Sequence, residues 1–373
     1  MDTNRAKGVV TELLGAAGVQ LDGPDASDLH VHDERFYGRV LADRELGLGE
    51  AYQDGWWSAE RVDELLAKIL AADLRSQMKL TPHLIGMALR AKLLNRQSVR
   101  RAAANAAAHY DIGNDLYERM LDKRMIYSCG YWQGVDDLDS AQEAKLDLIC
   151  RKLQLEPGLR LLDIGCGWGG LAHYAAQHYG VRVVGISPAI EQVQVATKRC
   201  SGLDVEIRQQ DFRTVTGTFD RIVSVGMLEH VGSKNITDFF DVNHRLLTDD
   251  GIAIHHTIGS NIWKDYNDPW FDRYIFPGGV LPSIMHLGEG AGRNWAIEDV
   301  HNFGPDYDRT LMAWLHNIEA AWDDLPAYDE HFRRTWRYYL QAAAASFRTR
   351  HLQLWQVVFT KVGQYSDTYQ AVR

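Results

Sequence analysis

A glycine-rich run after a short apolar segment constrains the fold of this chain more than any other feature: Leu161-Leu162-Asp163-Ile164-Gly165-Cys166-Gly167-Trp168-Gly169-Gly170. It predicts a buried strand that breaks into a tight turn and opens a helix, because glycines let a backbone approach a bound nucleotide closely. Gly165, Gly167 and Gly170 also fit the dinucleotide pattern G-x-G-x-x-G. That fold usually places a ribose-binding acid at the end of the next strand, roughly 20 residues on. Here the next expected strand, Val181–Ile186, ends in Ser187-Pro188. A purely structural glycine turn is the remaining alternative.

The acid instead precedes the glycines, at Asp163, in a D-x-G-x-G pattern. This pattern resembles motif I of the Rossmann-like S-adenosylmethionine-dependent methyltransferases. The resemblance implies an α/β fold of class I methyltransferase type, with a mostly parallel seven-stranded sheet and helices on both faces.

The alternation of segments after residue 159 agrees with such a fold, because strand–helix–strand units form parallel sheets through right-handed crossovers. Helices are expected to begin near Gly170, Pro188 and Ser233. Two more should span about Arg309–Trp322 and Glu330–Arg348. We expect strands near Leu159–Ile164, Val181–Ile186, Val205–Gln209, Arg221–Gly226, Ile252–Ile258 and Gln353–Thr360.

The N-terminal part, residues 1–100, is expected to form a smaller, mainly helical domain, and residues 101–373 the catalytic domain. Helices are predicted over Val9–Leu14, Val62–Leu70 and Leu84–Leu94, with short strands within Asp33–Tyr37 and Val40–Gly47.

The charge is unevenly distributed along the chain. The formal net charge is −10, yet Leu74–Tyr110 contains no Asp or Glu and carries Arg75, Lys79, Arg90, Lys92, Arg96, Arg100 and Arg101. One interpretation is a solvated helix face. The other is a docking surface for anionic lipid headgroups, to which each cation could contribute ~1 kcal/mol. Nucleic acid is not expected as a partner, because the acidic remainder of the chain would repel it.

The cysteines, Cys129, Cys150, Cys166 and Cys200, have no metal-like spacing and fit reduced thiols in a cytoplasmic enzyme. No signal peptide opens the chain, and no run of about 18 apolar residues predicts a membrane span. We therefore expect a cytoplasmic protein that associates peripherally with the inner face of the membrane.

Several further motifs identify a family by their order and spacing. The chain resembles the cyclopropane-fatty-acyl-phospholipid synthases and the mycolic acid cyclopropane synthases, from about His109 to Lys361. Its additional N-terminal region is similar to the bacterial phospholipid enzymes. The motifs are His109–Tyr117, Tyr127–Trp132, Leu162–Gly170, Val225–Gly232, His256–Gly259, Phe276–Gly279, Leu281–Ser283, Asn302–Tyr307 and Gln353–Gln356.

The resemblance implies transfer of a methylene group from S-adenosylmethionine to a cis double bond of an unsaturated phospholipid. Methylation leaves a carbocation, and loss of a proton from the added methyl group closes a cyclopropane ring. Water must be excluded, because it would trap the cation. The implied base is a bound bicarbonate held by Glu229, His256, Tyr307, Cys129 and the backbone of Ile258.

Each of these residues also has a structural interpretation. Glu229 could merely favour the dipole of a helix N-terminus, and His256 could be a satisfied core histidine. We expect its neighbour His255, which alternates to the opposite face, to have that core role. Tyr307 and Cys129 could be ordinary buried residues.

The resemblance also implies the cofactor contacts. Gly165 and Gly167 should admit the methionine and ribose portions, beside Asp163. Ser187 is expected to contact the ribose and is equally suited to capping the helix that follows, and the two roles are compatible. The other expected cofactor contacts are Tyr127, Ser128, Gln192, Asp211, Phe212 and Arg213.

The aromatic-rich insertion Gly259–Glu298 is expected to form the wall or lid of an acyl-chain tunnel, or alternatively an aromatic core. A homodimer is a family expectation. Two other functions stay open: methylation without ring closure, on an alkene or a small molecule, and lipid binding without catalysis.

Overall fold

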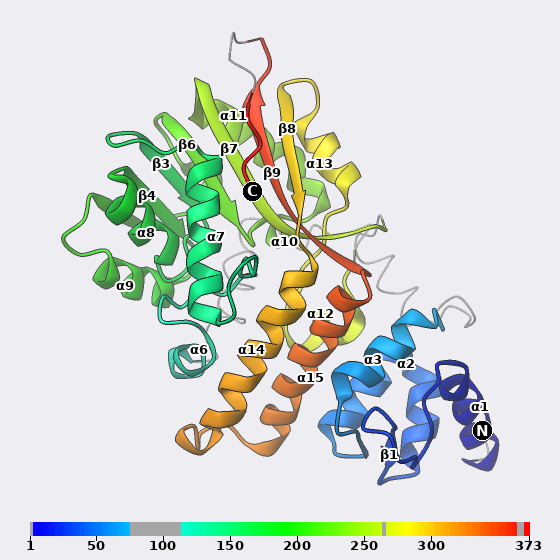
Figure 1. Cartoon of the computed structure of the whole chain (residues 1–373). Coiled ribbons are helices and arrows are strands. Elements are labelled where there is room, and N and C mark those ends of the chain that lie inside the picture. The colour runs from blue at the N-terminus through cyan, green and yellow to red at the C-terminus, as the bar shows by residue number, and fades with distance from the viewer. Residues whose placement is uncertain (1–2, 75–112, 263–265, 364–368) are drawn as a thin grey trace.

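The computed structural model describes residues 3–74, 113–262, 266–363 and 369–373 (Figure 1). Its centre is a seven-stranded sheet of order β5-β4-β3-β6-β7-β9-β8. The first five strands in this order are parallel, and only β9 runs antiparallel to its neighbours β7 and β8. The fold class expected from the sequence is therefore confirmed. The strands are β3 (Arg160–Ile164), β4 (Arg182–Ser187), β5 (Val205–Gln209), β6 (Phe219–Val225), β7 (Leu247–Ser260), β8 (Trp295–Asn302) and β9 (Leu352–Lys361).

Helices cover both faces of the sheet, and adjacent residues of one strand show this directly. Leu161 of β3 packs in a cluster with residues of α7 (Leu138–Lys152) and α8 (Gly170–Tyr179). Leu162 packs on the opposite face, with residues of α11 (Ile236–Leu246) and α13 (Ile284–Ala291). Because both faces are covered, the buried part of β3 does not alternate between apolar and polar residues: Leu161, Leu162 and Ile164 are apolar, and Asp163 is the one buried exception. The helices α9 (Ile190–Arg199) and α10 (Leu228–Val231) follow strands β4 and β6.

A long helical pair extends from one end of the sheet. Helix α14 (Pro305–Ala321) lies beside α15 (Glu330–Arg348), and both match the expected helices closely (Figure 1). Asp329 caps α15 by accepting a hydrogen bond from the Phe332 N–H. The short helix α6 (Asn114–Met120) packs against α14.

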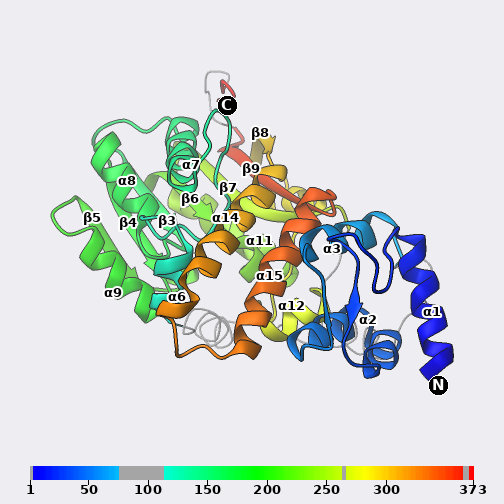
Figure 2. The same ribbon diagram turned by 60° about the horizontal axis from the view of Figure 1, so that its bottom comes forward.

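The N-terminal segment packs against this pair. Helices α2 (Arg35–Gln53) and α3 (Val62–Ala71) contact α15, and α2 also contacts α12 (Pro269–Tyr274), as Figure 2 shows from below. The Trp270 indole donates to Gln53 Oε1 over 2.9 Å, and Gln53 Nε2 donates to Thr335 Oγ1 over 2.7 Å. A buried hydrogen-bonded chain therefore joins the N-terminal helices to the insertion. The remaining elements are α1 (Thr3–Ala16), β1 (His30–Val31) and β2 (Trp57–Ser58).

One prediction for this segment is wrong, and another falls outside the described residues. The short strands expected within Asp33–Tyr37 and Val40–Gly47 are wrong, because both ranges lie largely in α2, which kinks at Arg44 (φ 51°). The buried Phe36, Tyr37 and Leu46 face neighbouring helices, so packing decides the conformation there. The expected helix Leu84–Leu94 and the boundary at residue 100 lie outside the described residues, as does the basic segment beyond Leu74.

The sequence also left strand β8 unrecognised, since part of it falls in the expected insertion Gly259–Glu298. It is an edge strand in which Glu298 and the buried Asp299 interrupt the apolar residues, while Ile297 and Val300 are exposed. Such a strand lacks the apolar run that marked the central ones. Among the residues placed by the structure, no helix combines the length and hydropathy needed to cross a bilayer.

Candidate active site

The candidate site lies where the parallel strands end. Strands β3, β4, β6 and β7 run in one direction, so their carboxyl ends meet at one edge of the sheet. The glycine turn follows β3, Ser187 ends β4, and Gly226 follows β6. Residues distant in the sequence are thereby brought together.

The glycine turn depends on conformations that other residues avoid. Gly165 has φ +85° and Gly167 has φ +54°, in the left-handed range that a Cβ disfavours. The N–H groups of Gly165 and Cys166 both donate to the Ile186 carbonyl, at 2.9 and 3.0 Å. The turn is thus tied to the end of β4 and leaves open space above Gly167.

A first cavity, the turn cavity, lies over these glycines. It brings together six of the expected cofactor residues. They are Tyr127, Ser128, Asp163, Gly165, Gly167 and Gln192. Asp163 is 1% exposed, and its Oδ2 has no hydrogen-bond partner among the described groups. Burial raises the pKa of Asp163 to about 7.

The other expected cofactor residues lie along the same edge. Asp211, Phe212 and Arg213 line an adjoining cavity that also contains Gly165 and Ile186. Arg213 donates to Asp211 through Nε and a terminal nitrogen, at 2.8 and 2.7 Å, which fixes the wall.

Ser187 ends β4 and is not itself among the residues that line these cavities. Its hydroxyl donates to Gln192 Oε1 over 2.9 Å and accepts from the Ala189 N–H over 3.2 Å. The second bond supports the chain as it enters α9. Gln192 reaches the turn cavity, and Ser187 holds it there.

A third cavity, the acceptor cavity, shares Tyr127, Ser128 and Gly226 with the turn cavity. Its wall also includes Glu229, His230, His256, Ile258 and Tyr307. Strand, helix and loop residues from positions 127 to 354 thus meet around one space.

Glu229 is held by a backbone bond at the rim of the acceptor cavity. The Ile258 N–H donates to Glu229 Oε1 over 2.6 Å, whereas Oε2 is buried without a hydrogen-bond partner in the part of the chain that is described. Burial raises the pKa of Glu229 to about 7, although the Ile258 bond opposes this shift. Such a carboxyl group changes its proton occupancy near neutral pH, which suits it to sharing a proton with a ligand.

His256 presents one ring nitrogen to the same space. Its Nδ1 lies 3.2 Å from the Gln356 amide nitrogen, and its Nε2 is buried without a partner among the residues placed. Burial lowers the pKa of His256 well below its usual value, so the ring is neutral. With the Gln356 amide donating to Nδ1, the proton lies on Nε2, which can donate. His255 lies on the opposite face against Phe239 and Phe240, the core role expected for it.

Tyr307 lines the acceptor cavity, whereas Cys129 is buried and is not among its lining residues. Tyr307 also stacks on Phe347 with ring centroids 4.6 Å apart. The Cys129 thiol donates to the Gly130 carbonyl over 3.1 Å and lies 3.9 Å from Thr310 Oγ1. Burial raises its pKa well above the usual value, so it is a thiol rather than a thiolate. All four cysteines are free and buried.

Residues of the insertion contribute both to the wall of the acceptor cavity and to the core. Asn267, Phe276, Gly279 and Leu281 line the acceptor cavity, and the Val280 N–H donates to the Glu229 carbonyl over 2.9 Å. In contrast, Trp270 belongs to the core and packs on Tyr338.

The sequence interpretation missed Lys145 of α7, which lines the turn cavity. It is 1% exposed, and its ammonium group donates to Ser128 Oγ over 2.8 Å. A signal was present, because Ala141, Lys145, Leu148 and Lys152 recur at helical spacing on the buried face. Lysine on an apolar stripe is rarely fully buried without a partner.

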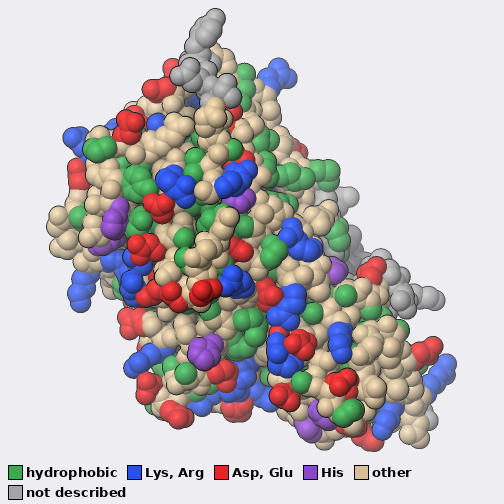
Figure 3. All heavy atoms as spheres, in the orientation of Figure 1, with side chains coloured by type: hydrophobic (Ala, Val, Ile, Leu, Met, Phe, Trp, Pro, Cys, Tyr) green, Lys and Arg blue, Asp and Glu red, His purple; other side chains and the backbone are tan. Residues whose placement is uncertain are grey.

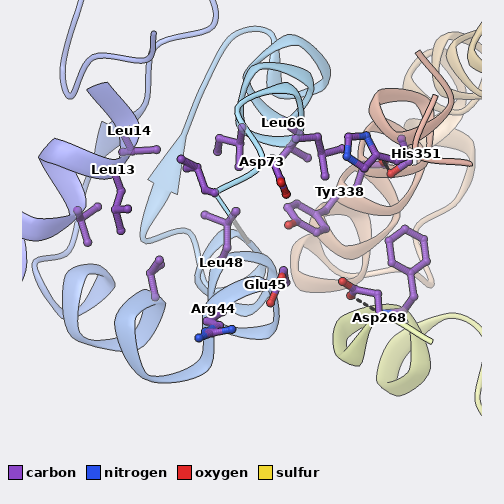
Figure 4. Close-up of a pocket in the computed structure, with 18 of the residues that line it drawn as sticks. Leu13, Leu14, Arg44, Glu45, Leu48, Leu66, Asp73, Asp268, Tyr338 and His351 are labelled. Carbon is purple, nitrogen blue, oxygen red and sulfur yellow. Dashed lines mark hydrogen bonds between the residues drawn. The ribbon is translucent and has the colours of Figure 1, made fainter. Parts of the chain in front are cut away.

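A larger cavity of about 170 Å³ lies elsewhere, among α1, α2, α3, α12 and α15 (Figure 4). Its lining is mostly apolar, including Leu14, Leu48 and Leu66, with Arg44, Glu45 and Asp268 near its rim. None of the expected site residues lines it. We place the chemistry at the sheet edge, because convergent polar groups with displaced pKa values lie there. Within the described chain, no group of His, Cys, Asp and Glu is arranged to hold a metal ion.

Comparison with known proteins finds relatives that match most of the chain. Residues 97–357 match the family model described as mycolic acid cyclopropane synthetase. The chain is 50% identical over 357 residues to the cyclopropane-fatty-acyl-phospholipid synthase of Escherichia coli (strain K12), covering 95% of this chain and 93% of that protein. It is 31% identical to the tuberculostearic acid methyltransferase UfaA1 of Mycobacterium tuberculosis, covering 91% and 84%. Among solved structures, the mycolic acid cyclopropane synthase CmaA1 complexed with SAH and CTAB is 33% identical, with a TM-score of 0.64 and coverage of 69% and 97%.

Proposed function

The chain belongs to the mycolic acid cyclopropane synthetase family of S-adenosylmethionine-dependent methyltransferases, and we propose that it forms cyclopropane rings in the unsaturated acyl chains of membrane phospholipids. The observation that carries the substrate class is the 50% identity to the Escherichia coli phospholipid enzyme, which extends over 95% of this chain. The site supports the reaction, because the turn cavity and the acceptor cavity share Tyr127, Ser128 and Gly226.

The two cavities divide the chemistry between them. S-adenosylmethionine, when bound, supplies an electrophilic methyl group, which an alkene needs because it is a weak nucleophile. Gly165 and Gly167 leave room for the donor, and the buried, unpaired Asp163 Oδ2 offers an acceptor to its ammonium group. Phe276 and Leu281 line the adjoining space with apolar surface that excludes water from the acceptor.

Ring closure requires a base beside the newly added methyl group, and we assign this role to a bound bicarbonate. The buried Glu229 Oε2 and His256 Nε2 lack partners within the described chain and line one cavity, which fits a small anion that carries an O–H group. Glu229 accepts the anion's hydroxyl, while His256 and Tyr307 donate to its oxygens. Cys129 and the Ile258 N–H complete the proposed set, although the Ile258 N–H here donates to Glu229.

The decisive assay is incubation with labelled S-adenosylmethionine and vesicles of monounsaturated phospholipid. We expect label in the acyl chains, with a gain of one methylene in mass and cyclopropane signals in the NMR spectrum. Mass alone is insufficient, because an alkene methylated with proton loss gains the same mass. An alkene product would replace ring closure by plain methylation, as the name of the 31%-identical relative would suggest. Lipid binding without label transfer would leave a non-catalytic protein.

The bicarbonate assignment makes a separate prediction. Activity should fall in degassed, carbonate-free buffer and return when bicarbonate is added, and the return should be weaker in His256→Ala, which lacks one donor. The measurement is initial rate against added bicarbonate for both proteins. Comparing the two matters more than depletion alone, because a tightly held anion survives degassing. Purified enzyme that contains no anion and loses no activity in either test would make a side chain the base.

The same function requires contact with a bilayer, and we propose that the N-terminal domain, residues 1–100, and the basic segment provide it. On the face in Figure 3, side chains of both signs are interspersed over the described surface. The acid-free sequence from Leu74 to Tyr110 differs from that pattern. We further propose a cytoplasmic homodimer that docks peripherally on the inner face of the membrane.

Replacing Arg90, Lys92, Arg96, Arg100 and Arg101 by Gln should weaken binding to anionic vesicles, most strongly at low salt. Activity on detergent-solubilised lipid should change less. Co-sedimentation with anionic and zwitterionic vesicles across a salt series measures the effect. Equal binding by both proteins throughout would mean that these charges form only a solvated face.

A further inference from the structure

Lys145 is a buried cation whose charge the protein leaves without an ionic partner. Among the described residues its hydrogen-bond partner is the neutral Ser128 hydroxyl, and no carboxylate of these residues lies within 4.0 Å of its ammonium nitrogen. An ammonium group has three donors, so two remain available. A buried, uncompensated charge is costly, and burial lowers the pKa of Lys145 to about 8.

A second lysine on the same helix shows how the fold treats a buried cation that has only a structural role. Lys152 Nζ lies 3.5 Å from Asp299 Oδ2 and 3.1 Å from His301 Nδ1. Arg373 also pairs with Asp299, so that site is a closed network. Lys145 differs from Lys152 because it lines a cavity and lacks such a network.

The wall of the turn cavity also carries an acidic side chain. Asp163 lies on its wall with Oδ2 buried and unpaired in the described structure. Asp122, the other carboxylate that acts on Lys145, accepts bonds from the Arg124 and Ile126 N–H groups instead. The cavity therefore presents one available ammonium group and one available carboxyl group beside the glycines. This pattern complements a zwitterionic α-amino acid group, which carries a carboxylate and an ammonium on one carbon.

We propose that Lys145 binds the α-carboxylate of the methyl donor's amino-acid portion, with Ser128 fixing the direction of its ammonium group. This inference rests on the proposed function. Lys145 thereby distinguishes donors that carry the complete amino acid from nucleosides that lack it, and holds the sulfonium between the two cavities.

The test compares ligands that differ only in this portion. Isothermal titration calorimetry measures the affinities of wild type and Lys145→Met for S-adenosylhomocysteine and for 5′-methylthioadenosine, which lacks the amino acid group. We expect Lys145→Met to weaken the binding of S-adenosylhomocysteine by about 10- to 100-fold, the usual contribution of a hydrogen bond to a charged group. The affinity for methylthioadenosine should change by no more than about 2-fold. Lys152→Met is the matched control: the same change, on the same helix, in a buried position outside the cavity, should leave the ratio of the two affinities unchanged.

A second measurement needs no variant. On wild type, the decarboxylated analogue of S-adenosylhomocysteine should bind at least about 10-fold more weakly than S-adenosylhomocysteine itself. Equal affinities would overturn the proposal, as would equal weakening of both ligands in Lys145→Met, which would give Lys145 only a structural role. Wild type that binds none of these ligands would refute the proposed function itself, a result distinct from either.

Discussion

Glu229→Gln should lower turnover by about 10²–10⁴-fold, the usual contribution of a positioned base, while leaving S-adenosylhomocysteine affinity nearly unchanged. An amide keeps the shape and still accepts the Ile258 N–H, but it cannot share a proton with an anion at the buried Oε2 position. Glu229 lines the acceptor cavity rather than the turn cavity, so cofactor binding should survive. The measurements are kcat at saturating lipid and cofactor, and calorimetric binding. Glu156→Gln, at an exposed position, is the control. Near-normal turnover would remove Glu229 from the mechanism.

The same variant should gain stability at high pH. The folded pKa of Glu229, about 7, lies above the ordinary value of 4.5. A carboxyl group with a raised folded pKa contributes stability below pH 4.5, and loses that contribution as pH rises through 7. Glu229→Gln does not ionise, so above pH 7 its free energy of unfolding should exceed that of wild type. Thermal melts from pH 5 to 9 measure the difference. An inactive yet more stable variant would identify Glu229 as a residue kept for function.

Gly165→Val should abolish cofactor binding, with a loss of at least about 100-fold in S-adenosylhomocysteine affinity. At φ +85° a β-branched side chain is strained, by about 1–3 kcal/mol, and its methyl groups would occupy the turn cavity. The protein itself leaves room, because an added Cβ would approach Met227 no closer than 3.5 Å. A loss of affinity would therefore mean that the new side chain occupies the space of the ligand.

Gly202→Val provides the matched control for this prediction. Gly202 has nearly the same backbone angle, φ +86°, and open space around it, but lies outside the cavities at the sheet edge. It should lose a similar amount of stability and bind S-adenosylhomocysteine normally. Calorimetry with thermal melts on both variants measures this. Equal loss of affinity in both would attribute the effect to strain alone.

Much of this architecture was predictable because its signals are local. The run Leu161–Ile164 followed by glycines marked β3 and its turn, and the helices expected over about Arg309–Trp322 and Glu330–Arg348 correspond to α14 and α15. Local sequence patterns did not predict the secondary structure where tertiary packing determines it. Phe36 and Tyr37 belong to a helix because they pack into the shared core. Strand β8 was not recognised because the charged Glu298 and Asp299 interrupt its apolar residues.

The sequence by itself determined the strand–helix alternation that follows the glycine turn, the turn itself and the family-specific residue types. These follow from periodicity, backbone preference and motif spacing, which are properties of short segments. Only the tertiary structure decided how those residues act. It placed the Ile258 N–H on Glu229, left His256 Nε2 unpaired among the described residues, and set Lys145 beside Ser128 and Asp163 in the turn cavity. The reason is physical: charge state depends on burial and on neighbours from distant segments, and neither is defined until the chain has packed.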